Sequence, residues 1–317
     1  MRLSFAPSVL ALALAAACTP PAPLTENDIA SCSNGRDDDE DTLVDCADPT
    51  CSLFAFCGTD AGTPDGGVDA SFDAFGLDVP DAPPTCAAPL DIALVLDVSS
   101  TMGAELIAIQ AALPSIWTRA HELDPTAQFS LVVFVDDVLL VNECAPFATV
   151  ESLVAAIETY RVLAPMNRNV ADPTLPNQDC PENSMDALFD AATECTFRSG
   201  STRVFWHATD DTFAERPAVL SGEWGGGVFV QSTYAEAGTA MVTRNIHLGS
   251  LARTGAGEFC GAGTTLDVGI GFHTPFGTQL SLPQVTNGAV WDQRGLGSTL
   301  DLAAEMRALI ERHHPCD

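Results

Sequence analysis

Apolar and polar residues occur in alternating blocks over the last two thirds of the chain. Continuous apolar runs predict buried strands, and runs with an apolar residue at every third or fourth position predict helices. Strands are expected at 92–96, 129–135, 138–141, 204–208, 245–250 and 289–291. Helices are expected at 104–123, at 150–161 with Thr149 as its cap, at 184–196 and at 300–312. We therefore predict an α/β domain over 86–317, with a doubly wound, mostly parallel sheet. The tight Asp136-Asp137 link predicts one antiparallel edge strand.

The first 30 residues have the pattern of an export signal and a tether. Arg2 precedes a short apolar run over 9–17, too short to span a bilayer, and the run ends at Cys18. The segment Leu14-Ala15-Ala16-Ala17-Cys18 resembles a bacterial lipoprotein box, which implies lipidation of Cys18. The alternative is ordinary cleavage after Ala17. We expect a signal peptide over 1–17 and a tether over 18–30, with Thr19 favouring an outer-membrane anchor.

A Cys- and Asp-rich stretch follows at 31–58. If Asp37 is position one of a twelve-residue calcium loop, carboxylates fall at positions three, five, nine and twelve, with a backbone carbonyl at seven. The stretch resembles thrombospondin type 3 calcium repeats, although Thr42 replaces the glycine of position six. The expected Ca²⁺ ligands are Asp37, Asp39, Asp41, Leu43, Asp45 and Asp48. The alternative is a charge run with two local disulfides and no metal.

Composition narrows the classes of partner. Residues 59–85 are rich in Asp, Gly and Pro and predict a disordered, acidic linker. The whole chain has 43 acidic and 13 basic residues, a formal net charge of -30, and no lysine. This charge argues against nucleic acid or anionic lipid as a partner.

The polar residues after the first predicted strand indicate a cation site. Asp97, Ser99 and Thr101 stand at alternate positions directly after that strand. Ligands bind at the carboxyl ends of strands in such sheets, and oxygen ligands suit a hard divalent cation. The segment resembles the D-x-S-x-S signature of von Willebrand factor A-type domains, where it forms part of a metal ion-dependent adhesion site. That family has the predicted layout of strands and helices, so the resemblance covers all of 86–317.

Two further loops supply the other ligands that this resemblance implies. The segment from Asn177 to Glu182 reproduces the N-x-D-x-P-E pattern of integrin β A-like domains, and Asp210 matches the family's distal aspartate. The sequence leaves open whether Glu182 or the Ser184 hydroxyl is the direct ligand. A second, neighbouring cation is implied at Asn177, Asp179, the Pro181 carbonyl and Glu182. The expected adhesion-site metal is Mg²⁺, with Mn²⁺ or Ca²⁺ as alternatives.

The expected function is cation-dependent adhesion or assembly, in which the metal's open position accepts a carboxylate of a protein partner. No metalloprotease or nucleophile-elbow motif is present, and the scattered histidines are expected to be structural, so we do not expect an enzyme. The alternatives are an envelope lipoprotein that its metals only rigidify, and a metal-dependent hydrolase. The sequence does not set the oligomeric state.

Cysteine spacing leaves the disulfides open. The pairs expected are Cys86 with Cys316, Cys144 with Cys180, and Cys195 with Cys260. Two irregular segments, 163–181 and 255–285, are expected to shape what the metal face binds.

Overall fold

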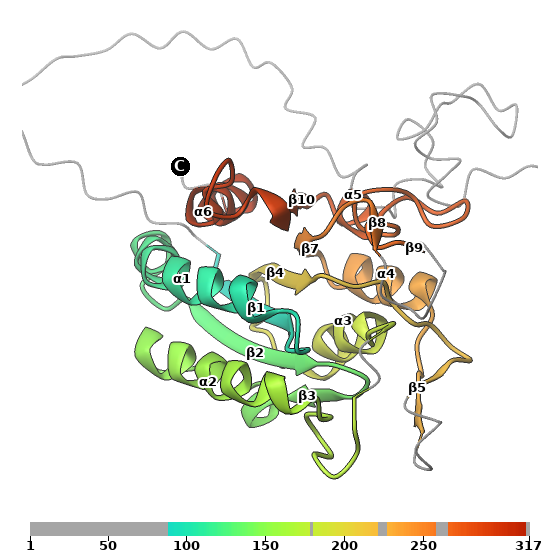
Figure 1. Ribbon diagram of the computed structural model, residues 1–317. Coiled ribbons are helices and arrows are strands. Elements are labelled where there is room, and N and C mark those ends of the chain that lie inside the picture. Colours follow the sequence, from blue (N-terminus) through green and yellow to red (C-terminus); the bar gives the residue numbers. More distant parts are fainter. Residues whose placement is uncertain (1–87, 178–179, 221–226, 258–265, 315–317) are drawn as a thin grey trace, which may run out of the picture. The chain divides into compact units, whose positions relative to one another are not determined.

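The computed structural model describes residues 88–177, 180–220, 227–257 and 266–314. These residues form an α/β domain around one six-stranded sheet, in the order β10-β7-β4-β1-β2-β3 (Figure 1). The strands are β1 (Leu90–Asp97), β2 (Gln128–Phe134), β3 (Val138–Leu140), β4 (Thr202–Thr209), β7 (Ile246–Ala252) and β10 (Ala289–Asp292). All neighbouring pairs are parallel except β2 with β3. The predicted fold class, including the antiparallel edge strand, is confirmed.

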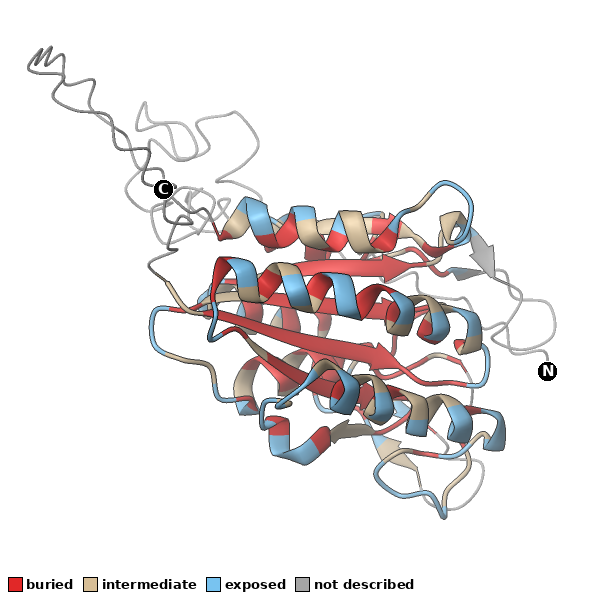
Figure 2. Ribbon diagram, turned by 90° about the vertical axis from the view of Figure 1, so that its left-hand side faces the viewer, coloured by how far each residue is buried: buried red, intermediate tan, exposed pale blue. Residues whose placement is uncertain are grey.

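The central strands are apolar because helices cover both of their faces. Every residue of β1 is buried, as a parallel strand between two helical layers requires (Figure 2). The helices are α1 (Gly103–Leu123), α2 (Val150–Leu163), α3 (Ser184–Glu194), α4 (Tyr234–Thr243), α5 (Leu282–Val285) and α6 (Leu302–His313). One core cluster joins α1, α2 and α6 to the sheet, and another joins α3, α4 and α5 to its other face (Figure 1).

Local signals fix where several helices begin. Thr149 caps α2 as predicted, because its side chain accepts a hydrogen bond from the Ser152 N–H. Helix α4 starts with a reciprocal capping box between Thr233 and Glu236. This helix is absent from our sequence prediction, as are the short hairpins β5–β6 (Val219–Leu220 and Val228–Phe229) and β8–β9 (Ala256–Gly257 and Leu266–Asp267). Single helical turns of the 3₁₀ type are η5 (Val141–Cys144), η6 (Ala164–Met166) and η8 (Gln293–Gly295).

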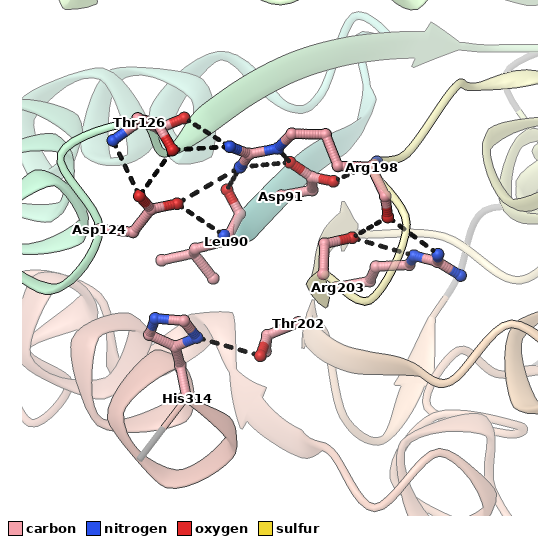
Figure 3. Close-up of polar contacts among 9 residues, drawn as sticks. Leu90, Asp91, Asp124, Thr126, Arg198, Thr202, Arg203 and His314 are labelled. Atoms are coloured by element: carbon pink, nitrogen blue, oxygen red, sulfur yellow. Dashed lines mark hydrogen bonds and ion pairs between the residues drawn. The ribbon is translucent and has the colours of Figure 1, made fainter. Parts of the chain in front are cut away.

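The amino-terminal edge of the sheet is held by Arg198. Its guanidinium lies 2.7 Å from Asp91 and 3.4 Å from Asp124, and both of these carboxylates are buried (Figure 3). The same group donates to the Leu90 carbonyl and to Thr126. This edge of the sheet therefore neutralises its buried acids with the protein's own cation.

Two of the expected disulfides are wrong. Cys144 pairs with Cys195 across 51 residues of chain, rather than with Cys180, and so Cys195 is not available to Cys260. The two cysteines lie in η5 and at the end of α3, which pack together against β2 and β3. Spacing along the chain does not reveal this packing. Cys86 and Cys316 lie outside the described residues.

Other sequence predictions also lie outside the described residues. These are the signal peptide, the lipidation at Cys18, the calcium loop from Asp37 to Asp48, and the linker. No helix in the described part of the chain combines the length and the apolarity that crossing a membrane requires.

Candidate metal site at the carboxyl edge of the sheet

Three loops meet at the carboxyl ends of the strands. One follows β1, one precedes α3, and one follows β4, which lies next to β1 in the sheet. The parallel order of β1 and β4 brings Asp97 and Asp210 to the same edge, 113 positions apart in sequence by their numbers. This is the edge at which open α/β sheets bind ligands.

The residues of the β1 loop form a connected polar chain. Asp97 is fully buried, and its carboxylate accepts hydrogen bonds from the Ser99 N–H and the Thr209 hydroxyl, both at 2.7 Å. The Ser99 and Thr101 hydroxyl oxygens lie 3.3 Å apart. Thr101 in turn donates to Asp210 at 3.0 Å. The structure thus brings together Asp97, Ser99, Thr101 and Asp210.

Glu182 is fixed beside this group by its backbone. Its N–H donates to the Thr212 carbonyl and its carbonyl accepts from the Ala214 N–H, both at 2.9 Å. The next residue, Asn183, donates its N–H to the Val135 carbonyl at the end of β2. The loop before α3 is therefore attached to the segments that follow both β2 and β4.

Ser184, the other residue considered as a direct ligand, makes a different contact. Its hydroxyl lies 3.3 Å from His207 Nε2, and His207 Nδ1 lies 2.9 Å from the Ser250 hydroxyl. All three residues are buried. Among the two candidates, Glu182 is the one whose charge interacts with Asp97.

The residues expected to hold a second cation are only partly described. The Asn177 amide nitrogen donates to Glu182 Oε1 at 3.4 Å, so these two side chains lie together. Pro181 follows a cis peptide bond with Cys180. Asp179 lies outside the described residues.

The electrostatics of the edge favour a cation. Burial, and then the charge of Asp210, raise the pKa of Asp97 to about 8. Burial raises the pKa of Glu182 well above its usual value, and the charges of Asp97, Asp136 and Asp211 raise it further. Glu182 Oε2 is buried and accepts no hydrogen bond within the described part of the chain. A divalent cation would satisfy this oxygen and offset the repulsion between the carboxylates.

The side chains that lie together at this edge offer oxygen atoms as metal ligands, and those of Ser99 and Thr101 are neutral hydroxyls. Within the described ranges, no group of three or more His, Cys, Asp or Glu side chains has the arrangement of a metal site by itself. The Ser99 and Thr101 hydroxyls lie at the same edge as the carboxylates and are neutral oxygen atoms that a cation could use. Such a set fits Mg²⁺, Mn²⁺ or Ca²⁺ better than a metal that prefers sulfur or nitrogen ligands.

Sequence reasoning gave no role in the site to four polar residues of this edge, namely Thr209, Asp136, Asp211 and Asn183. Thr209 donates to Asp97, and Asn183 donates from its amide to the Asp136 carbonyl at 3.0 Å. Asp136 and Asp211 act through their charge on Glu182. Thr209, Asp136 and Asp211 lie within two residues of the ends of β2 and β4, so the strand-end rule could have included them, and Asn183 directly follows Glu182.

Comparison with known proteins does not assign a role to any residue of this chain. No family model matches the chain, and no curated protein matches it. Proximal thread matrix protein 1 from the mussel byssus is 15% identical, with a TM-score of 0.42 over 71% of this chain and 46% of that protein. The chain thus spans about half the length of the mussel protein. A form of that protein "with zinc occupied MIDAS motif" is 14% identical, with a TM-score of 0.42 over 72% of this chain and 46% of its own.

A bacterial protein has a similar level of likeness. An aerotolerance-related membrane protein from Bacteroides fragilis NCTC 9343 is 14% identical, with a TM-score of 0.43 over 71% of this chain and 98% of that one. The order of the strands and the single antiparallel edge strand give this domain a von Willebrand factor A-like fold.

Proposed function

We propose that the domain is a divalent-cation-dependent protein-binding module, in which the cation's open position accepts a carboxylate from a partner. The observation that carries this proposal is the buried, unpaired Glu182 oxygen beside Asp97, at an edge where the Ser99 and Thr101 hydroxyls also lie. Within the described residues, the charges that act on Glu182 are those of other carboxylates, whereas Asp91 and Asp124 lie against Arg198.

Each residue has a distinct role in the proposed site. Ser99, Thr101 and Glu182 would coordinate the cation directly. Asp97 and Asp210 would neutralise its charge through the hydroxyls that they hold and through water. Because two of the three direct ligands are neutral, the cation would keep enough positive charge to attract a further carboxylate, which is the group that an acidic partner presents.

Binding is favoured over hydrolysis by the state of His207, which contacts Ser184 of the predicted site. His207 is 1% exposed, and burial lowers its pKa to about 3. An enclosed imidazole that stays neutral is poorly suited to exchange protons with a substrate. The second alternative is that the metal only stabilises the fold. The capture of a partner protein distinguishes this role from cation-dependent binding.

The cation is tested by a matched pair of variants at Thr101. Thr101 is exposed, so Thr101→Val removes a hydroxyl ligand without disturbing the core. We expect Thr101→Val to weaken Mg²⁺ binding by about tenfold or more, and Thr101→Ser to bind nearly as the wild type does, in titration calorimetry of EDTA-stripped protein. Equal affinities for all three proteins, or no Mg²⁺ binding at all, would contradict the proposed site.

The partner is tested by capture from the envelope and medium of the producing cell. We expect the wild-type and Thr101→Ser proteins to retain a protein in Mg²⁺ and release it in EDTA, while Thr101→Val retains none. If Mg²⁺ binds in calorimetry but only raises the unfolding temperature, with no cation-dependent capture, the metal is structural.

The domain is proposed to stand at the cell surface on a lipid anchor at Cys18, after export and removal of 1–17. Mass spectrometry of the envelope form should show the added mass of acyl chains on the peptide that begins at Cys18. An unmodified, secreted chain would exclude the anchor and leave ordinary cleavage after Ala17.

The segment 31–58 is proposed to bind one Ca²⁺ and to precede a flexible spacer. Calcium calorimetry on the Thr101→Val protein, with and without 31–58, isolates this segment from the sheet edge. One Ca²⁺ site should disappear with the deletion. Identical titrations would show that the carboxylates of 31–58 form only a solvated charge run.

A further inference from the structure

A cavity of about 590 Å³ lies beside the β1 loop. It is formed by Val98, by the end of α2 and by the segment that follows η6, and its volume is in the range of ligand-binding pockets. We call it the α2 cavity, and the lining residues used below are Val98, Tyr160, Leu163, Met166, Arg168 and Asn169.

Asn169 gives the α2 cavity an unsatisfied polar group. Its side chain is 2% exposed, and within the described residues neither the amide nitrogen nor the amide oxygen has a hydrogen-bond partner. Leaving both groups buried and unpaired is costly. One donor and one acceptor on the same planar amide complement a peptide group, which offers one acceptor and one donor.

The other walls are apolar and partly open to solvent. Met166 is 64% exposed and Leu163 is 45% exposed, which is unusual for two large apolar side chains that line the same cavity. Arg168 lies at the exposed rim, in a chain with a net charge of -30. The cavity thus combines apolar contact surface, one peptide-like amide and one local positive charge.

The cavity is held open by hydrogen bonds of the segment 167–177. The Asp137 carboxylate accepts from the N–H groups of Val170, Ala171 and Asp172 at 2.7 to 2.9 Å. The Asn169 N–H donates to the Leu175 carbonyl at 3.1 Å. A ligand would enter a shape that the chain already maintains, so little ordering free energy is lost on binding.

Two connections join the α2 cavity to the candidate metal site. Val98, which lines the cavity, stands between Asp97 and Ser99. Asn177, at the far end of the same segment, donates to Glu182 and also pairs with Asn167 through their backbones. A ligand in the cavity therefore lies next to the residues that would hold the cation.

We propose that the α2 cavity binds a large apolar side chain and its peptide group from an extended segment of an acidic protein partner. A carboxylate of the same segment then reaches the cation. This second statement rests on the proposed function, whereas occupation of the cavity does not. The partner recognised is thus an acidic–apolar peptide, rather than any exposed carboxylate.

The cavity is tested without metal, using N-acetyl-leucine N-methylamide as the probe. The full-length protein is labelled with ¹⁵N at asparagine, and the Asn169 side-chain amide signal is followed in EDTA. We expect this signal to shift with saturation at millimolar probe. Asn169→Leu and Met166→Ala should weaken binding by about tenfold, as the loss of a hydrogen-bond pair or an apolar wall implies.

A matched control comes from α2, whose end forms part of the cavity. Val162 is 55% exposed and does not line the cavity, so Val162→Ala should bind the probe as the wild type does. Met166→Ala changes an exposed side chain and should keep the fold even if Asn169→Leu does not. No shift of the Asn169 amide in folded wild-type protein overturns the proposal, as does equal weakening by Val162→Ala.

The connection to the cation is tested with acetylated peptide amides that carry Asp and Leu, separated by one, two or three glycines. At the spacing that matches the site, Mg²⁺ should tighten binding at least about tenfold over EDTA, because two linked contacts act together. Thr101→Val should abolish this gain and leave the binding of blocked leucine unchanged. If N-acetyl-leucine N-methylamide binds but Mg²⁺ does not raise the affinity for any of the peptides, the proposed binding in the cavity holds and the shared-segment proposal is overturned. Calorimetry with Mg²⁺ then shows whether the proposed metal site also fails.

Discussion

At the scale of single residues, Glu182 combines two opposed effects in one side chain. Without a cation its burial and its carboxylate neighbours disfavour the charged form. With a cation the same charge becomes favourable. The charge of Glu182 should therefore lower the stability of the metal-free protein and strengthen the binding of a cation.

The variant Glu182→Gln separates these effects. It keeps the shape of the side chain but removes the charge, so the metal-free protein should become more stable by on the order of 1 kcal/mol at pH 7. The additional stability that saturating Mg²⁺ confers should shrink. Chemical unfolding in EDTA and in Mg²⁺ measures both quantities, and Glu151→Gln, at an exposed position of α2, is the control. A variant that is less stable in EDTA would contradict the account of this carboxylate.

The sequence identified only some of the residues that follow the strands. Asp97, Ser99, Thr101 and Asp210 follow apolar runs directly, so their shared edge follows from the parallel sheet. Asp136 was interpreted only as part of a turn, because a tight link between two antiparallel strands already accounts for an aspartate at that position. The choice between Glu182 and Ser184 depended on which side chain faces His207, and this contact between distant elements has no local signal.

At the scale of elements, the amino-terminal edge of the sheet depends on one guanidinium. Arg198 contacts two carboxylates, a carbonyl and Thr126, from a segment just before β4 (Figure 3). Burial tends to raise the pKa of Asp124, but bonds from Thr126 and Leu90, and then the charge of Arg198, lower it overall. The Asp124 carboxylate is therefore kept as an anion first by its hydrogen bonds and then by the positive charge of Arg198.

Replacing Arg198 by methionine should destabilise the domain by about 3 kcal/mol or more, because it leaves two buried carboxylates without the positive charge that lies against them. Arg198→Lys should recover only part of this loss, since an ammonium group cannot make the same set of bonds. Urea unfolding of both variants and of Arg312→Met, at an exposed position, provides the comparison. Equal stability of the methionine and lysine variants would show that the geometry of the guanidinium is unimportant.

Element prediction succeeded where the apolar pattern was long and failed where it was short. The helix over 104–123 and the buried strands follow from their periodicity. Helix α4 was missed because Gly238 and several threonines reduce its local helical propensity. The glycine allows close packing on α5, since a Cβ there would lie 3.3 Å from the Leu282 side chain. The Thr233–Glu236 capping box was the available signal.

At the scale of the whole molecule, half-buried histidines make stability depend on pH. The His247 and His313 rings stack at 3.6 Å between β7 and α6. Burial, and then the charges of His247 and Arg312, lower the pKa of His313 to about 4. The unfolded chain binds this proton near pH 6.5. The contribution of the neutral His313 ring to the free energy of unfolding is therefore complete above about pH 6.5 and is lost as the pH falls towards 4.

The variant His313→Asn removes this contribution. Between pH 7 and pH 5 its unfolding free energy should fall by about 1 kcal/mol less than that of the wild type, after allowance for screening at a half-buried site. Urea unfolding at the two pH values measures the difference. The same loss in both proteins would contradict the lowered pKa of His313.

The Asp137 carboxylate has a consequence for the wall of the α2 cavity. Three successive N–H groups point at one side chain, which amounts to a backbone nest for an anion that the protein fills from within. In a protein with Asp137→Ala, the nest would be vacant but still polarised. Formate or acetate from the solvent could then occupy it, and the shape of the segment 167–177 would become subject to chemical rescue by a dissolved carboxylate.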